Sequence, residues 1–405
     1  MNDAALTSPR LYALDNLRAL MMWLGIVLHV AINHITTDSP LPWRDPKTSP
    51  AADLLLLFIH SFRMPVFFIL AGYFAALLAE RRGAGGMLKN RSLRLALPFA
   101  VFWPPLFVLT AVLSMVYIHL TVRGVPGLDT ALTPARQPGG SPFNTMHLWF
   151  LYQLFWLCVM AWAALRLRRL LPAKLGGAAR SGFAQLVQRR WGFLVLAWPL
   201  ALVGTFYPSG IVAGTGSFLP PFTEWVQSGL FFVFGWYLHG PREQHLLALL
   251  AARCKSHAAA GLAFFIATVL LLGAVRGGTA LPLAWPGPAF WIAGAYNATS
   301  WLWSLALIGA FVRYLPHRNA VLAYLSQSSY WVYLVHMLGT IGFGILLFNA
   351  PLGALAKMGL NIAATSLAAL ASYELMVRRT RIGTFLNGRR VVRSARTTPS
   401  SPTCR

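Results

Sequence analysis

Charged residues are scarce in this chain. Only 11% of its 405 residues are Asp, Glu, Lys or Arg, whereas about 25% is usual in soluble domains. Apolar residues make up 57%, and the mean hydropathy is +0.58. Apolar runs of about 17–25 residues recur along the whole length, and this is the length that crosses the hydrocarbon core of a bilayer. The composition argues against a soluble domain and predicts a multi-pass membrane protein.

Cysteine and acidic residues are few as well. The three cysteines lie in an apolar segment (Cys158), a basic loop (Cys254) and the C-terminal segment (Cys404), a spacing that fits neither a metal site nor a disulfide framework. Only ten residues are Asp or Glu, so a carboxylate-rich cation pathway is poorly supported. Metalloprotease, nucleotide-binding and nucleophile-elbow motifs are missing from any credible context. We therefore expect no metal and no tightly bound cofactor.

The apolar runs predict an all-α bundle of about ten transmembrane helices in one domain. Their expected bounds are 17–34, 54–79, 95–118, 146–165, 191–207, 223–239, 258–275, 289–312, 326–348 and 352–376. The membrane domain is predicted to cover residues 11–388, after a short cytoplasmic segment at 1–10. Residues 389–405 are basic and rich in Ser, Thr and Pro, which predicts a disordered cytoplasmic tail.

The net charge of +24 is distributed unevenly among the loops. In a soluble protein such a charge would suggest nucleic acid, but here Lys and Arg concentrate in alternate short loops, so no nucleic-acid partner is expected. The loops on the other side hold only Arg44, Lys47, Arg123, Arg136 and Arg276. The positive-inside rule then predicts that both termini are cytoplasmic, in a bacterial inner membrane. The oligomeric state stays open.

Three ionisable residues mark the first predicted helix, where a charge at the helix centre costs about 2.5–3.5 kcal/mol on insertion scales. Arg18 and His29 are separated by about three turns, so they share a face roughly 16 Å apart along the axis. Asp15 lies within about 60° of both. A cap with a snorkelling anchor, and an interhelical hydrogen bond for the histidine, are structural alternatives to a functional site.

Two further ionisable residues, His60 and Arg63, are neighbours on one face of the second predicted helix, near its outer end. They are expected to converge with His29 in one outward-facing cavity, unless they are interfacial anchors. Before the third helix, Arg91 and Arg94 share a cytoplasmic face and could bind phosphates or act as positive-inside anchors.

Two more histidines, His147 and His336, stand beside aromatic residues that are typical of a membrane-interface belt, and we interpret both histidines as structural.

Taken in order, the motifs resemble those of the membrane-bound acyltransferase 3 family. They are Arg18 with His29, Phe62-Arg63-Met64-Pro65-Val66-Phe67-Phe68 with Ala71-Gly72, Arg91-x-x-Arg94 with Pro98, His147-Leu148-Trp149-Phe150-Leu151, and Ser329-Tyr330 through His336. The second helix and the ending Tyr373-Glu374-Leu375 look most like the branch of periplasmic glucan succinyltransferases.

The resemblance covers roughly residues 10–390 and implies functional roles for Arg18 and His29. It also implies that Arg91 and Arg94 bind an acyl-CoA donor. The family often has Ser before the glycine of the second helix, so a role for that hydroxyl cannot apply to Ala71.

From these residues we expect transfer of an acetyl or succinyl group from cytoplasmic acyl-CoA to a hydroxyl of an envelope carbohydrate such as a periplasmic glucan. His29 would be the general base or would itself be acylated. Arg63 or His60 would stabilise the oxyanion, and Asp15 would pair with Arg18 on the donor route. The alternatives are a transporter or flippase for a glycan or lipid precursor, and acylation of a lipid or small metabolite.

Overall fold

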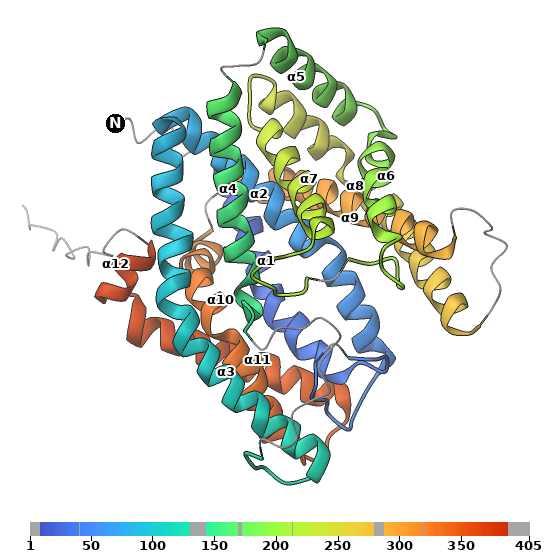
Figure 1. Ribbon diagram of the computed structural model, residues 1–405, viewed down its shortest axis with the longest axis vertical. Coiled ribbons are helices and arrows are strands. Elements are labelled where there is room, and N and C mark those ends of the chain that lie inside the picture. Colours follow the sequence, from blue (N-terminus) through green and yellow to red (C-terminus); the bar gives the residue numbers. More distant parts are fainter. Residues whose placement is uncertain are drawn as a thin grey trace, which may run out of the picture.

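The computed structural model describes residues 9–39, 41–129, 143–168, 172–212, 214–278, 287–317 and 319–387 (Figure 1). Within these ranges the regular elements are helices and none is a strand, which confirms the all-α prediction. The α-helices are α1 (Pro9–Ala31), α2 (Pro50–Arg91), α3 (Leu97–Arg123), α4 (Trp149–Leu167), α5 (Ala173–Gln188), α6 (Gly192–Gly204), α7 (Phe222–Leu238), α8 (Glu243–Arg276), α9 (Pro288–Tyr314), α10 (Ala320–Leu347), α11 (Ala354–Ser372) and α12 (Arg381–Asn387).

The second and third predicted helices form one continuous helical segment of 74 residues. Ser49 caps α2 by accepting from the N–H of Ala51, and Pro50 occupies the first turn. Gly83 bends the helix with a φ of 72°, and a π-helical turn, η3 (Ser92–Ala96), leads into α3. The expectation of a loop at 81–94 is therefore wrong, because the bend and the extra residue of a π turn redirect the chain without ending the helix.

Six helical segments are long and apolar enough to cross a membrane. They are Tyr12–His34, Pro50–Arg123, Met146–Leu167, Glu243–Arg276, Ala320–Leu347 and Ala354–Val377. The second of these would extend about 110 Å if straight, which exceeds the roughly 30 Å of a bilayer core. α6 and α7 have only 13 and 17 residues. The chain is thus a multi-pass membrane protein, while the number ten and the side of the termini remain predictions.

Part of the expected cytoplasmic loop at 166–190 is helical. It contains α5, which lies at the top of Figure 1 and meets α6 at an angle of 107°. The amphipathic pattern of α5 was hidden by its Gly, Lys and Arg residues, which read as a polar connection. The predicted segment 1–10, except for its last two residues, and the predicted tail lie outside the described residues.

Close approach of the helices depends on small residues. A Cβ at Gly72 in α2 would collide with the Phe232 carbonyl in α7, and a Cβ at Gly235 in α7 would collide with the Ile69 carbonyl in α2. α1 lies inside the bundle against α10, α2 and α9, with Leu14, Leu17 and Met21 fully buried. This central position makes α1 the helix around which a buried site can be built.

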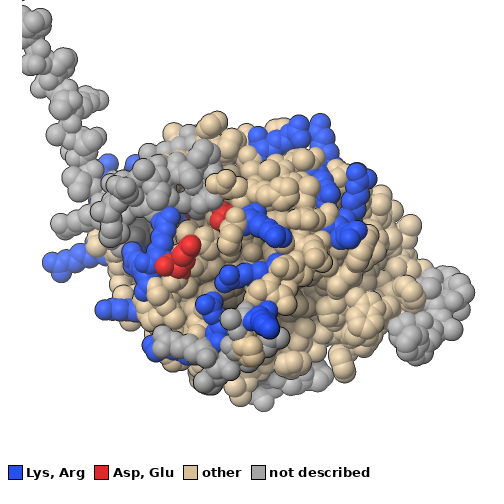
Figure 2. Space-filling model, turned by 90° about the horizontal axis from the view of Figure 1, so that it is seen from above, with Lys and Arg blue, Asp and Glu red and all other residues tan. Residues whose placement is uncertain are grey.

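The outside of the bundle is apolar over its middle and basic at one end. Trp198, Leu367 and Val108 expose 61%, 68% and 60% of their surface, as expected for side chains that face lipid. Figure 2 shows Lys and Arg side chains gathered over the face seen from above, where few acidic side chains are visible. α5 lies toward this end in Figure 1.

Candidate active site

The polar residues of α1 lie at two levels of the bundle. Near the start of the helix, Arg18 contacts the Asp15 carboxylate at 3.2 Å and donates to the Ser326 hydroxyl at 3.2 Å. Both members of this ion pair are 43% exposed. His29 lies almost three turns further along, near the end of α1. The helix therefore separates the two predicted site residues, and Arg18 does not contact His29.

Three imidazole rings from three different elements meet around the end of α1. The ring centroids of His29 and His336 are 5.2 Å apart, and those of His336 and His147 are 5.4 Å apart. His336 belongs to α10, and His147 belongs to a single 3₁₀ turn (Met146–Leu148) that precedes α4. We call His29, His147 and His336 the histidine cluster.

Hydrogen bonds to backbone carbonyls fix the protons of two of these rings. Nε2 of His147 donates to the Leu334 carbonyl at 3.0 Å, and Nδ1 of His336 donates to the Tyr333 carbonyl at 2.8 Å. The other nitrogens, Nδ1 of His147 and Nε2 of His336, are buried and have no hydrogen-bond partner among the described residues. A neutral imidazole carries its lone pair on such a nitrogen. The histidine cluster thus offers unpaired basic nitrogens inside the bundle.

His29 differs from the other two rings in its surroundings. It is only half-buried, whereas His147 and His336 are 7% and 3% exposed. Within the described part of the chain no hydrogen bond holds its imidazole. His29, which the sequence predicted to be catalytic, is therefore the most exposed of the three rings and the one without a hydrogen bond.

Arg63 joins the histidine cluster from α2. Its side chain is 6% exposed, and its Nε–H donates to the Met21 carbonyl of α1 at 3.2 Å. The guanidinium packs against the backbone of Gly25, because a Cβ added there would lie only 2.8 Å from one of its terminal nitrogens. Its carbon lies 5.9 Å from the centre of the Phe67 ring. From here its charge acts on His29. A buried cation is costly in a membrane protein, and it is usually retained for a function.

His60 lies one turn before Arg63 on α2 but faces α9. Its Nδ1 shares a hydrogen bond of 2.6 Å with the Tyr296 hydroxyl, and the ring lines a separate pocket. The expected single cavity is thus divided. Arg63 faces α1 and the histidine cluster, while His60 stands between that cluster and the pocket, because a separation of three residues turns a side chain by about 60°.

The two arginines before α3 have different surroundings. Nε of Arg91 is buried without a hydrogen-bond partner in the described chain, near the side chains of Cys158 and Arg18. Arg94 donates to the Leu386 carbonyl of α12, and its own carbonyl accepts from the Tyr330 hydroxyl at 2.9 Å. Arg91 therefore has an unused donor beside another cation, an arrangement suited to an anion, whereas Arg94 also connects three helices.

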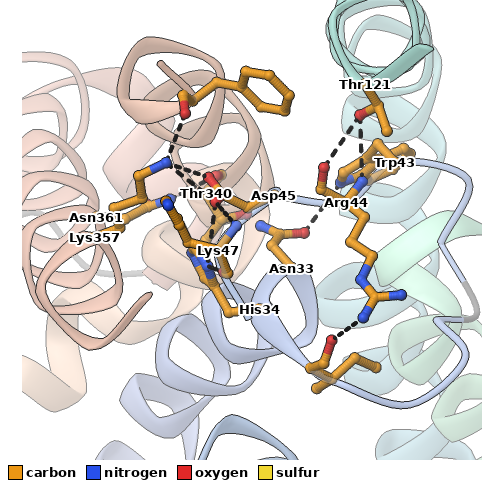
Figure 3. A network of polar contacts seen from close by, with 12 residues as sticks. Asn33, His34, Trp43, Arg44, Asp45, Lys47, Thr121, Thr340, Lys357 and Asn361 are labelled. Atoms are coloured by element: carbon orange, nitrogen blue, oxygen red, sulfur yellow. Dashed lines mark hydrogen bonds and ion pairs between the residues drawn. The ribbon is translucent and has the colours of Figure 1, made fainter. Parts of the chain in front are cut away.

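A buried ion pair joins Asp45, in the loop after α1, to Lys357 in α11 (Figure 3). The Lys357 ammonium contacts both oxygens of Asp45 at 3.1 Å and donates to the Phe348 carbonyl at 2.6 Å. Asp45 and Lys357 are each 1% exposed. In the same network, the Trp43 indole donates to Asn33 at 3.1 Å. The loop after α1 is thereby fixed to α11, which holds the end of α1 that carries His29.

Sequence reasoning missed several of these residues. His147 and His336 were interpreted as structural, and Tyr296 and the Asp45–Lys357 pair were not singled out. One partial signal pointed to the cluster: His29 and His147 stand toward the outer ends of predicted helices, whereas His336 stands in the middle of its predicted helix. A search of the described residues for three or more His, Cys, Asp or Glu that could hold a metal ion finds no such group.

Comparison with known proteins gives the family. The acyltransferase domain of the acyltransferase 3 family matches residues 11–373. Glucans biosynthesis protein C of Shigella dysenteriae serotype 1 and that of Escherichia coli O157:H7 are each 29% identical to this chain over 359 residues, which cover 83% of each chain. No solved structure matches. Because the family match spans most of the chain, this protein belongs to the acyltransferase 3 family and is a membrane acyltransferase.

Proposed function

We propose that this acyltransferase moves an acetyl or succinyl group from cytoplasmic acyl-CoA to a hydroxyl of an envelope carbohydrate such as a periplasmic glucan, in the bacterial inner membrane. The names of the relatives support a glucan acceptor. The observation that carries the chemistry is the histidine cluster, in which the half-buried His29 lies beside His336 and within the field of Arg63. A transporter or flippase gains no support from a match to an acyltransferase domain.

The donor side of the proposal rests on three arginines. Arg18 and Arg91 lie near each other, and Arg94 follows one turn after Arg91. Their guanidinium groups would hold the phosphates of CoA, since planar guanidinium forks match phosphate oxygens. The pantetheine arm would then extend along α1 from Arg18 toward His29, a distance of about 16 Å. Asp15 would limit the positive charge at the entrance through its ion pair with Arg18.

The chemical step takes place at His29 in this proposal. The imidazole accepts the proton of the acceptor hydroxyl, and the oxygen attacks the thioester carbonyl. Arg63 stabilises the negative charge of the tetrahedral intermediate. Collapse of that intermediate breaks the carbon–sulfur bond, and the departing CoA sulfur takes the proton from His29. The products are an ester and CoA, and the imidazole is neutral again.

Replacement of His29 tests the proposal. We expect His29→Ala to lower acyl transfer from radiolabelled acyl-CoA to envelope glucan by about 10²- to 10⁴-fold. The exposed His245 at the opposite end of the bundle supplies the matched control, His245→Ala, which should retain normal transfer. Normal transfer by His29→Ala at a normal membrane level would exclude the catalytic role.

An acyl-histidine intermediate is the second chemical route to the same product. The two routes differ in what happens without an acceptor. Incubation with labelled acyl-CoA alone, followed by rapid denaturation, would leave label on the wild-type chain and none on His29→Ala if the histidine is acylated. A wild-type chain without label supports the base mechanism.

A further inference from the structure

The mechanism above does not use the pocket that His60 lines. It is a partly open hollow of about 520 Å³, solvent space included, between α2, α4, α7, α9 and the segment before α7. Except for Phe231, just past the middle of α7, the helical lining residues come from the half of each helix that comes first in the chain, as Trp149, Glu224 and Tyr296 illustrate. By the charge pattern of the loops, these are the predicted outer halves of the helices.

The lining of this outer pocket fits an uncharged, hydroxyl-rich ligand. Aromatic walls come from Phe68, Trp149 and Phe231, and polar groups come from amides and hydroxyls. Neither Lys nor Arg lines the pocket within the described part of the chain, although the protein carries 34 of them. Its one carboxylate, Glu224, already accepts from the N–H of Thr215 at 2.9 Å. The pocket therefore lacks the cations that CoA or a phospholipid headgroup would need.

Two glutamines that line this pocket have buried amide oxygens without a hydrogen-bond partner among the described residues. Gln153 is 2% exposed, and its amide nitrogen donates to the Glu224 carbonyl at 3.2 Å, so its oxygen is the buried atom left without a partner. Asn297 donates to the Ala293 carbonyl at 2.9 Å and must therefore accept from the Gln227 amide nitrogen at 3.1 Å. The Gln227 oxygen is then also left without a partner among the described residues.

Serine hydroxyls add further acceptors. Ser61, Ser228 and Ser300 each donate to a carbonyl of their own helix, at 2.7, 2.7 and 3.0 Å. Their protons are thus engaged, and their oxygen lone pairs can still accept. A pocket with surplus acceptors and aromatic walls calls for a ligand with many hydroxyl donors and apolar C–H faces. A neutral sugar has both.

We propose that the outer pocket binds a neutral carbohydrate, the acceptor of the acyl group, with Gln153 and Gln227 accepting hydrogen bonds from its hydroxyls. This inference rests on the proposed function. His60 borders the pocket and stands next to Arg63, and Trp149 follows His147 by two residues. A sugar held in the pocket thus lies on the far side of His60 from the histidine cluster, and its hydroxyl would reach His29 past the His60 side chain.

The variants Gln153→Met and Gln227→Met keep the side-chain size and remove the accepting oxygen. The probe is the unacylated neutral glucan fraction of cells that lack the gene. We expect each variant to raise the KM for this glucan about three- to tenfold, and to leave the KM for acyl-CoA within about twofold of wild type. Gln244→Met, at an exposed position on α8, is the matched control and should behave as wild type.

Binding without the donor gives a second readout. In saturation-transfer NMR titrations on the detergent-purified protein, the variants should need about three- to tenfold more glucan for half of the maximal signal and keep the wild-type titration with acyl-CoA. If a glutamine variant fails to fold, Val212→Trp fills the pocket from the segment before α7 and should have the same effect. If these variants are active and bind the glucan with the wild-type KM and affinity, the outer pocket is not the glucan site, and the proposed function still stands. A wild type that neither acylates nor binds the glucan would overturn both.

Discussion

The imidazole of His29 in α1 lies 5.2 Å from that of His336 in α10, centroid to centroid, although 306 residues separate them in the chain. The contact is possible because α1 packs extensively against α10 inside the bundle. His336 keeps its Nδ1 proton on the Tyr333 carbonyl, so the unpaired Nε2 can receive a hydrogen bond. His336 is therefore placed to orient His29 and to share the proton that His29 takes up.

Replacing His336 by Gln should lower kcat by about 10²-fold and leave the KM for acyl-CoA nearly unchanged. The substitution removes the second imidazole from His29 but keeps a polar side chain. The pH dependence of kcat should also change, because a catalytic proton would no longer be shared. His147→Gln, one ring further from His29, should have a smaller effect. A His336→Gln enzyme with the wild-type kcat and pH profile would show that the ring only fills space.

The sequence was most informative where a single helix decides the geometry. The rise and period of an α-helix placed Arg18 and His29 on one face at two levels, and the structure has them at two levels. Contacts between helices could not be predicted from the sequence, because the packing of α1 against α10 depends on the complementary shapes of segments far apart in the chain. That is why His147 and His336 were interpreted as structural residues.

The same distinction applies to the fold. Hydrophobic runs located the helical regions, since their length and apolar character are local properties. They did not reveal η3 or the bend at Gly83, which keep residues 50–123 helical. The polar Asp45–Lys357 pair joins a loop to α11 and has no periodic signature. These features depend on tertiary contacts rather than on local composition.

Arg91→Ala should raise the KM for acyl-CoA about 10- to 100-fold, as expected for the loss of hydrogen bonds to a charged group. An S-acyl pantetheine lacks the adenosine phosphates, so the variant and the wild type should use this donor equally well. Arg242→Ala, an exposed basic position between α7 and α8, serves as the control. If Arg91→Ala raises the KM for acyl-CoA and for S-acyl pantetheine by the same factor, Arg91 does not bind the phosphates.

Arg94→Ala should differ from Arg91→Ala in one respect. Arg94 also donates to the Leu386 carbonyl, so its loss frees a contact between η3 and α12. We expect a lower unfolding temperature in addition to a higher KM for acyl-CoA. The unfolding temperatures of the two single variants are compared in the same detergent. If Arg94→Ala unfolds at the wild-type temperature, the contact with α12 contributes little.

Lys357→Met should destabilise the protein by about 3–5 kcal/mol, because it leaves the Asp45 carboxylate buried without its cation. Asp45→Asn combined with Lys357→Met should recover part of the loss. The partly exposed pair of Arg378 and Glu374, at 2.8 Å, provides the contrast. Arg378→Met should cost less than about 1 kcal/mol, because solvent screens that pair. If Lys357→Met and Arg378→Met lower the free energy of unfolding equally, burial does not decide the contribution of these ion pairs.

The stability of the protein should fall as pH rises through the pKa of His239. This residue lies in the connection between α7 and α8, outside the candidate membrane spans. Its ring hydrogen-bonds to Glu243 at 2.9 Å and to Glu80 at 2.7 Å. These bonds, that to Glu243 above all, raise the pKa of His239 in the folded protein. The charged form is thus favoured by folding.

The sign follows from proton linkage. The contribution of His239 is complete below its unfolded pKa of about 6.5 and is lost as the pH passes its raised folded pKa. His239→Gln should therefore lower the unfolding temperature at about pH 5.5 and have less effect at about pH 9. The measurement is thermal unfolding of both proteins across this range. A difference that does not depend on pH would exclude the linkage.

Gly25→Ala should slow catalysis without unfolding the protein. The added Cβ would stand 2.8 Å from a terminal nitrogen of Arg63, and the end of a flexible side chain can move aside at little cost in stability. The guanidinium would then leave its place beside the histidine cluster. Because removing one oxyanion donor typically lowers kcat by about 10²- to 10³-fold, we expect a displaced one to lower it about 10- to 100-fold. Gly85→Ala on α2, where a Cβ meets no neighbour, is the matched control and should keep the wild-type kcat. Equal kcat values for the two alanine variants would show that Arg63 does not act on the reacting atoms.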